Sequence, residues 1–351
     1  MPVKPASDTR PRIPYLDLLR IAAICVVMVL HIAYRGKNET DVRTLLWTGK
    51  NFFNGFSRWG VGVLVMVSGA LFLGRDIPLK KLYGKYILRI VLAFLFWSFA
   101  YAFVFYYAGS GGRAGFLWAF ASGHYHLWFL FMIAGLYSVV PFLRRIVQDE
   151  KLTVYFLVLS FIFAFVLPQS VTLIRLFSPD LADKVNRVFA QFQLHFVLGY
   201  TFYFVLGYWL SKTALSRKAE TVFLVLGAAG FIATILGNYA VSVWKGQSGE
   251  YIFENNMVNV ALQAVGVFVL FKKLFGSKKA GKLLPSLSKY SFGAYLLHAG
   301  VISTVDKFLH LNADSFNPFL SIPLVFLLTC ILSFALSALL NHIPVIKKYL
   351  V

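Results

Sequence analysis

The pattern of apolar positions along this chain is dominated by runs too long for a soluble domain. A helix needs about 20 mostly apolar residues to cross the hydrocarbon core of a bilayer, and ten such runs follow one another with short polar connections. The pattern therefore predicts an all-α, polytopic integral membrane protein with about ten transmembrane helices. The expected spans are residues 14–34, 51–74, 87–108, 125–143, 152–170, 193–211, 221–243, 255–273, 290–309 and 318–341.

These runs fill most of the chain, which predicts a single membrane domain. We expect a polar tail at residues 1–13, one domain over residues 14–341 and a second tail at residues 342–351. The longest expected connections, near 171–192 and 272–289, are too short to fold as domains of their own.

Composition agrees with a membrane protein, and the distribution of charge predicts its orientation. Of 351 residues, 59% are hydrophobic and 14% are charged, against about 25% charged residues in soluble domains. A net charge of +20 would also suit binding to nucleic acid. However, 21 of the 34 Lys and Arg lie in the first tail and in alternate connections counted from it, and nine lie in the opposite connections. This positive-inside bias predicts cytoplasmic tails and a lipid bilayer, not nucleic acid, as the partner.

The first expected span carries three ionisable side chains, Asp17, Arg20 and His31. Arg20 and His31 are eleven residues apart, which places them within about 20° of one helix face and about 16 Å apart along the axis. Asp17 lies one turn before Arg20 and can pair with it, and the two can also act as anchors at the headgroups. His31 lies deeper, where an ionisable group costs about 2.5–3.5 kcal/mol and usually marks function.

The second expected span contains Gly60, Gly62 and Gly69. Small residues let membrane helices approach one another closely. The glycines therefore predict tight packing of this span against its neighbours.

A basic segment, with Lys81, Lys85 and Arg89, leads into the third expected span. Basic residues at such a position usually anchor the helix at the cytoplasmic headgroups. They are also charge-assisted hydrogen-bond donors to phosphate. The density of the segment and the depth of Arg89 favour a second role, as ligands of a nucleotide cofactor.

Further polar side chains recur in or beside the later spans. Each has a structural interpretation, in an aromatic belt or an interhelical hydrogen bond, and a functional one, in the lining of a substrate cavity. Three amides step by four along the eighth expected span and so share one stripe, where they would join helices or bind sugar hydroxyls. The candidate substrate-binding residues are His126, Trp128, Asn255, Asn259, Gln263 and His298.

The chemistry that these residues favour is proton transfer by an imidazole. The sequence has no zinc-ligand spacing, no glycine-rich phosphate loop and no Gly-x-Ser-x-Gly elbow, so we expect no metal. Histidine titrates near neutral pH and suits general acid–base catalysis. We predict His31 and Arg20 as catalytic residues: His31 would deprotonate an acceptor hydroxyl or otherwise assist the reaction, and Arg20, with Arg89, would orient a donor or stabilise negative charge.

Several motifs, in order along the chain, resemble the acyltransferase-3 family of bacterial integral membrane acyltransferases. They are the Arg20–His31 spacing preceded by Asp17, Ser68-Gly-Ala-Leu71, the basic segment before Arg89, His126-Leu-Trp-Phe-Leu130 and Ser291-Phe-Gly-Ala-Tyr-Leu-Leu-His298. The chain departs from the family in one place, because the family often has two arginines three residues apart where this chain has Tyr86 and Arg89.

The resemblance implies an O-acyltransferase of the bacterial inner membrane. Its co-substrate would be cytoplasmic acyl-coenzyme A, most commonly acetyl-coenzyme A. Its acceptor would be a hydroxyl of a cell-envelope polysaccharide or of the lipid-linked precursor, and polysaccharide-synthesis machinery would be a partner.

Two other classes of function use some of the same residues. A transporter or flippase for a glycan intermediate would explain the amide stripe, but not the Arg20–His31 face or the basic segment. A structural scaffold for an envelope-synthesis complex would predict that substitutions of His31 are silent.

Overall fold

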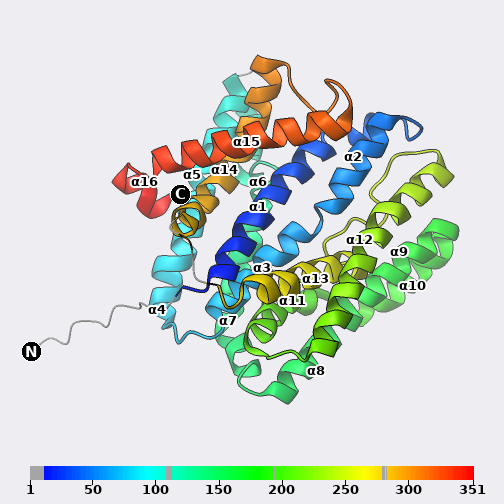
Figure 1. Ribbon diagram of the computed structural model, residues 1–351, viewed down its shortest axis with the longest axis vertical. Coiled ribbons are helices and arrows are strands. Elements are labelled where there is room, and N and C mark those ends of the chain that lie inside the picture. The colour runs from blue at the N-terminus through cyan, green and yellow to red at the C-terminus, as the bar shows by residue number, and fades with distance from the viewer. Residues whose placement is uncertain (1–11, 108–112, 193–194, 279–280, 282) are drawn as a thin grey trace, which may run out of the picture.

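The structure is a computed structural model that describes residues 12–107, 113–192, 195–278, 281 and 283–351. These residues fold into a bundle of helices with no strand among them (Figure 1). The α-helices are α1 (Pro14–Tyr34), α2 (Leu45–Phe56), α3 (Trp59–Phe72), α4 (Leu79–Lys81), α5 (Leu88–Tyr107), α6 (Arg113–Ser122), α7 (Trp128–Ile146), α8 (Glu150–Phe161), α9 (Leu167–Phe177), α10 (Pro179–Phe192), α11 (His195–Lys212), α12 (Arg217–Lys245), α13 (Val258–Phe275), α14 (Leu284–Leu309), α15 (Pro318–Leu340) and α16 (Pro344–Tyr349).

Eight helical segments in the described residues are long and apolar enough to cross a membrane. The prediction of an all-helical, polytopic membrane protein is therefore confirmed. The expected spans 193–211 and 290–309, which are not among the eight, correspond to α11 and α14 in the same bundle. The eight segments are Pro14–Glu39, Leu45–Phe72, Leu79–Val104, Trp128–Ile146, Glu150–Phe177, Arg217–Lys245, Val258–Phe275 and Pro318–Leu340.

The prediction of a connection near residues 171–192 is wrong, because these residues are mostly helical. Helix α9 continues to Phe177, and α10 follows almost at once, with Pro179 at its first turn, where proline is favoured. An ion pair of 2.8 Å between Arg175 and Asp183 joins the two helices. Because α10 is amphipathic and largely polar, a search for apolar runs of membrane length misses it.

The second expected span, 51–74, is two helices that meet at Ser57 and Arg58. Helix α2 starts earlier than expected, at Leu45, because the Thr44 side chain caps it by accepting a hydrogen bond from the Trp47 backbone N–H. At the break the guanidinium of Arg58 is buried, and it donates to the Asn54 side chain at 2.8 Å and to the Phe253 carbonyl at 2.9 Å. The break thus lets a buried cation find its partners.

Helix α1 lies inside the bundle, against α2, α3, α13, α14 and α15 (Figure 1). Its apolar side chains Leu16, Leu19, Ala23 and Met28 are buried among these neighbours. The helix that carries the ionisable groups is therefore surrounded mostly by protein.

Glycines set the spacing of α3 and α11, as the sequence predicts for the second span. A methyl group added at Gly69 would lie 1.8 Å from the Phe204 carbonyl oxygen, and one at Gly207 would lie 2.1 Å from the Met66 carbonyl oxygen. Two backbones so close leave no room for a side chain. This contact places one wall of the cavity described below.

We predict that Gly207→Ala destabilises the protein, because one of the two backbones must move. Overpacking of this kind costs about 1–3 kcal/mol. Thermal unfolding of the purified protein in detergent measures the effect. Gly135→Ala, at a position in α7 where an added methyl group meets nothing within 4 Å, is the matched control and should not lower the melting temperature. Equal losses in the two variants would contradict this account of α3–α11 packing.

Candidate active site

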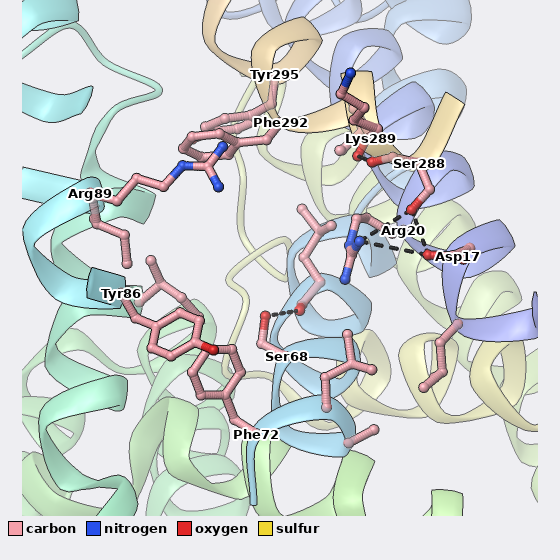
Figure 2. Close-up of a pocket in the computed structure, with 18 of the residues that line it drawn as sticks. Asp17, Arg20, Ser68, Phe72, Tyr86, Arg89, Ser288, Lys289, Phe292 and Tyr295 are labelled. Atoms are coloured by element: carbon pink, nitrogen blue, oxygen red, sulfur yellow. Dashed lines mark hydrogen bonds and ion pairs between the residues drawn. The ribbon is translucent and has the colours of Figure 1, made fainter. Parts of the chain in front are cut away.

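A cavity of about 870 Å³ opens between α1, α3, α5, α7 and α14 (Figure 2). Counted over the described residues, seven side chains that line it are cationic and one, Asp17, is anionic. Clustered cations in a cleft attract anions and concentrate them locally. We call this cavity the basic pocket; its cationic residues are Arg12, Arg20, Arg75, Arg89, Lys212, Lys289 and Lys347.

Arg20 is fixed at one side of the basic pocket by α1 and α14 together. Its guanidinium lies 3.7 Å from the Asp17 carboxylate, one turn earlier, so the predicted pairing is confirmed. It also donates to the Ser288 hydroxyl at 3.2 Å, and that hydroxyl donates to Asp17 at 2.5 Å. Three side chains therefore hold the guanidinium at the pocket wall.

Arg89 enters the basic pocket from the opposite side to Arg20 (Figure 2). It is the second residue of α5 and follows a π-helix over Leu82–Ile87, a type of local distortion frequent at functional sites. Its guanidinium lies 5.7 Å from the centre of the Phe292 ring and donates to the backbone oxygen of Val351.

The predicted cofactor-binding residues do not all reach the basic pocket. Arg89 lines it, whereas Lys81 and Lys85 are exposed and are not among its lining residues. The ammonium of Lys85 lies 5.7 Å from the ring of Tyr86, and it is Tyr86 that lines the pocket.

Four of the seven histidines meet further along α1 and α14, and we call them the histidine cluster: His31, His124, His126 and His298. The rings of His31 and His298 are stacked, with centroids 5.2 Å apart and planes 24° apart. His126 lies 5.0 Å from His298, and the Nδ1 atoms of His124 and His126 are 2.9 Å apart. The ring of Tyr125 meets His31 edge-on at 4.9 Å.

Hydrogen bonds define which nitrogens of the cluster carry protons. Nδ1 of His298 contacts the carbonyl oxygen of Tyr295, which can only accept, so this nitrogen carries the hydrogen and Nε2 is left as an acceptor. That Nε2 is buried and has no hydrogen-bond partner among the described residues. By the same argument Nε2 of His126 donates to the Leu296 carbonyl at 3.3 Å, and its Nδ1 accepts from His124.

The basic pocket and the histidine cluster are built on the same two helices. Arg20 contacts Ser288, and His31 contacts His298, so α1 and α14 run alongside each other in the same direction. From Arg20 to His31 the rise along α1 is about 16 Å, and from Ser288 to His298 along α14 it is about 15 Å. Both α1 side chains face α14, as the predicted common face requires.

The candidate substrate-binding residues do not lie together. Two of them, His126 and His298, lie with His31 in the histidine cluster. Trp128 begins α7, is 37% exposed, and packs 5.9 Å from the ring of Tyr200.

The amides lie elsewhere in the bundle, and only two of them share a helix. Asn255 precedes α13, which begins at Val258. The prediction that three amides share one stripe of a helix is therefore wrong for Asn255. Its amide donates to the Tyr200 hydroxyl at 3.1 Å. Asn259 donates to Thr234 and to the Ile252 carbonyl, each at 2.9 Å. Gln263 donates to the Gly55 carbonyl at 3.3 Å, and its own side-chain oxygen is buried without a partner among the described residues.

Some site residues could not be found by reading the sequence alone. Ser288, Lys212 and Lys347 come to the basic pocket from segments far from Arg20 along the chain, and nothing local marks them. His124 has the position of an ordinary loop histidine until His126 is placed beside it. Across the described residues, no three or more His, Cys, Asp or Glu side chains are grouped so that they could hold a metal ion.

The fold and these sites define a polytopic membrane protein with a basic pocket and a cluster of four imidazoles, of which His126 and His298 are buried. The acyltransferase-domain family model of the acyltransferase-3 type matches residues 13–338, nearly the whole chain. The chain belongs to this family and is a membrane acyltransferase. No match is found among curated proteins or among solved structures.

The histidine cluster should make stability depend on pH. Burial lowers the pKa of His124 to about 4, against about 6.5 in an unfolded chain. The unfolded state therefore binds more protons between these values, and stability falls as pH decreases from about 6.5 to about 4. We expect the melting temperature in detergent to fall over this window, and His124→Gln to reduce the fall.

The control for this pH series is His342→Gln, since His342 is exposed just after α15 and its ring contacts the Ala338 carbonyl. His342→Gln should leave the change of melting temperature with pH as it is in the wild type. If His124→Gln also leaves this change as it is in the wild type, the assignment to His124 is contradicted.

Proposed function

We propose that this membrane acyltransferase transfers an acyl group, most simply acetyl, from acyl-coenzyme A to a hydroxyl of a cell-envelope polysaccharide or its lipid-linked precursor. The observation that carries the proposal is that an anion-attracting pocket and an imidazole cluster are lined by the same pair of helices, α1 and α14. We place the enzyme in the bacterial inner membrane, with both tails cytoplasmic and polysaccharide-synthesis machinery as its partner. The charge bias of the connections supports this orientation.

The basic pocket suits the donor. Coenzyme A carries several phosphates, and guanidinium and ammonium groups are strong charge-assisted donors to phosphate oxygens. Arg89 is the residue that we propose to contact them, because it lines the pocket and its planar fork can bind two oxygens at once. Lys289 and Lys347 add positive charge around the same pocket. The pantetheine arm would then extend past Arg20, along α1, toward His31.

The histidine cluster suits the transfer. In the proposed step the acceptor oxygen attacks the acyl carbon, a C–O bond forms and the C–S bond breaks. His31 takes the proton from the hydroxyl, and the leaving thiolate of coenzyme A is protonated to the thiol, so no net proton is gained or lost. Arg20 lines the pocket on α1, the helix that also carries His31, and would orient the donor or stabilise negative charge.

We place the acceptor hydroxyl beside His31 and His298. The unpartnered Nε2 of His298 is a hydrogen-bond acceptor in a buried place, and such an atom costs stability unless a ligand or a water satisfies it. His126 contributes to the same cluster. For Asn259, the existing bonds support a role in joining α12 and α13 over one in binding sugar.

The proposal is tested by acyl transfer in proteoliposomes that hold the purified protein, radiolabelled acetyl-coenzyme A and envelope glycan extract. We expect label to reach glycan with wild type, and the rate to fall about 10²–10⁴-fold in His31→Ala, the range typical of losing a general base. Equal rates at equal protein levels would remove His31 from the mechanism. Counterflow of a glycan intermediate without any donor, and no labelled product, would instead support a flippase.

Donor binding tests the role of Arg89 separately. We expect Arg89→Ala to weaken acetyl-coenzyme A binding at least tenfold, since a hydrogen bond to a charged group contributes about 1.5–3 kcal/mol. Arg89→Lys should recover only part of the loss, because it keeps the charge and loses the fork. Lys80→Ala, in the same basic segment but at a residue that does not line the pocket, is the control and should bind like wild type. Unchanged binding in Arg89→Ala would refute the donor site at this place.

A further inference from the structure

Tyr295 belongs to both the basic pocket and the histidine cluster. Its side chain lines the pocket, and its ring lies 5.7 Å from the ring of His126 and 5.6 Å from that of His298. The pocket lining includes Ile24 on α1 but none of the four histidines. The pocket therefore ends, on the side of the cluster, at Tyr295.

The face of α14 explains this position. Ser288, Phe292, Tyr295 and His298 follow one another at steps of three or four residues, which places them along one side of a helix. The first two line the basic pocket, and the last lies in the cluster. On this face of α14, Tyr295 thus lies between Phe292, beside it in the pocket lining (Figure 2), and His298 of the cluster.

The contacts of Tyr295 hold it in that place. Its hydroxyl donates to the backbone oxygen of His126, and its own carbonyl accepts from Nδ1 of His298. Its ring packs 5.6 Å from that of Phe129, another residue of the pocket lining. The side chain is only 5% exposed. The ring of Tyr295 therefore lies between a side chain of the pocket lining, Phe129, and two rings of the histidine cluster, His126 and His298.

We infer that Tyr295 is the gate between donor pocket and histidine cluster, and that the room left by its ring sets the length of the acyl group transferred. This inference rests on the proposed function, because it takes the basic pocket as the donor site. A short acyl group passes when the ring turns aside. A longer one meets the ring and Phe129, since a close-packed interior does not yield easily to added volume. Tyr295 is in this account a specificity-determining residue rather than the base.

The test compares acetyl-, butyryl- and hexanoyl-coenzyme A with wild type and four variants of the full-length protein in detergent. Tyr295→Ala and Tyr295→Leu remove the ring, Tyr295→Phe keeps it and removes the hydroxyl, and Tyr290→Ala removes a tyrosine of the same helix that does not line the pocket. The readout is the ratio of the dissociation constants for hexanoyl- and acetyl-coenzyme A. This ratio needs no acceptor, and it is not moved by a uniform loss of folded protein.

We expect the preference for the longer donor to rise at least tenfold in Tyr295→Ala and Tyr295→Leu, because each CH₂ that enters freed apolar space favours binding about fourfold. Tyr295→Phe and Tyr290→Ala should keep the ratio of wild type. Tyr295→Leu, which stays apolar, answers the question if Tyr295→Ala does not fold. A ratio within twofold of wild type in the folded ring-deleted variants would overturn the inference.

If the proposed function is wrong, the transfer assay gives a different result from the binding assay. Neither wild type nor any variant then transfers label from a donor to glycan, while the ratios of the dissociation constants can still shift. If wild type transfers acetyl and the ratios do not move, the function stands and the gate is wrong.

Discussion

The structure depends on the way in which α1 satisfies its ionisable side chains inside a membrane domain. Charged groups at membrane depth cost about 2.5–3.5 kcal/mol each unless protein or water receives them, and α1 carries an acid, a guanidinium and an imidazole. Side chains of helix α14 contact all three. Ser288 bridges Asp17 and Arg20, and His298 stacks on His31. These contacts fix the axial register of the two helices, so the basic pocket and the histidine cluster stand at a set distance from each other.

The two sites differ in electrostatic character, and the proposed function gives each of them a different substrate group. The basic pocket is dominated by permanent cations and favours an anionic ligand. In the histidine cluster, the contact between the Nδ1 atoms of His124 and His126 requires that one of these two nitrogens carries no proton, so the two imidazoles cannot both be cations. In the proposed function, the phosphates of the donor bind at the first site and the acceptor hydroxyl at the second. An acyl group attached to a long flexible arm is a substrate that can reach from one to the other.

The sequence predicted those features that follow from periodicity within one helix. The apolar runs predicted the spans, the i, i+3 spacing predicted the Asp17–Arg20 pair, and the eleven-residue spacing predicted that Arg20 and His31 face one neighbour. Features that depend on contacts between helices were not predictable. Ser288 and Tyr295 come to their positions because α14 packs on α1, and the amphipathic α10 lacks the apolar run by which a membrane span is predicted.

Local breaks were the other source of error. Asn255 was assigned to a helical stripe, but the helix starts after it, at Val258. Similarly, the break at Ser57 and Arg58 depends on partners in the segment before α13, since Arg58 donates to the Phe253 carbonyl. A periodic pattern gives no sign of such a break when the residues on both sides are apolar or small.

The most direct test of this account is to locate the acyl end of the donor in the protein. An acyl-coenzyme A analogue with a short photoreactive acyl group would be bound to the purified protein, irradiated, and the labelled residues identified by mass spectrometry. The account predicts labelling on α1 and α14, between Arg20 and His31 and between Ser288 and His298, that unlabelled coenzyme A competes away. Labelling confined to α12 and α13 around Asn259 and Gln263, with the same competition, would contradict it.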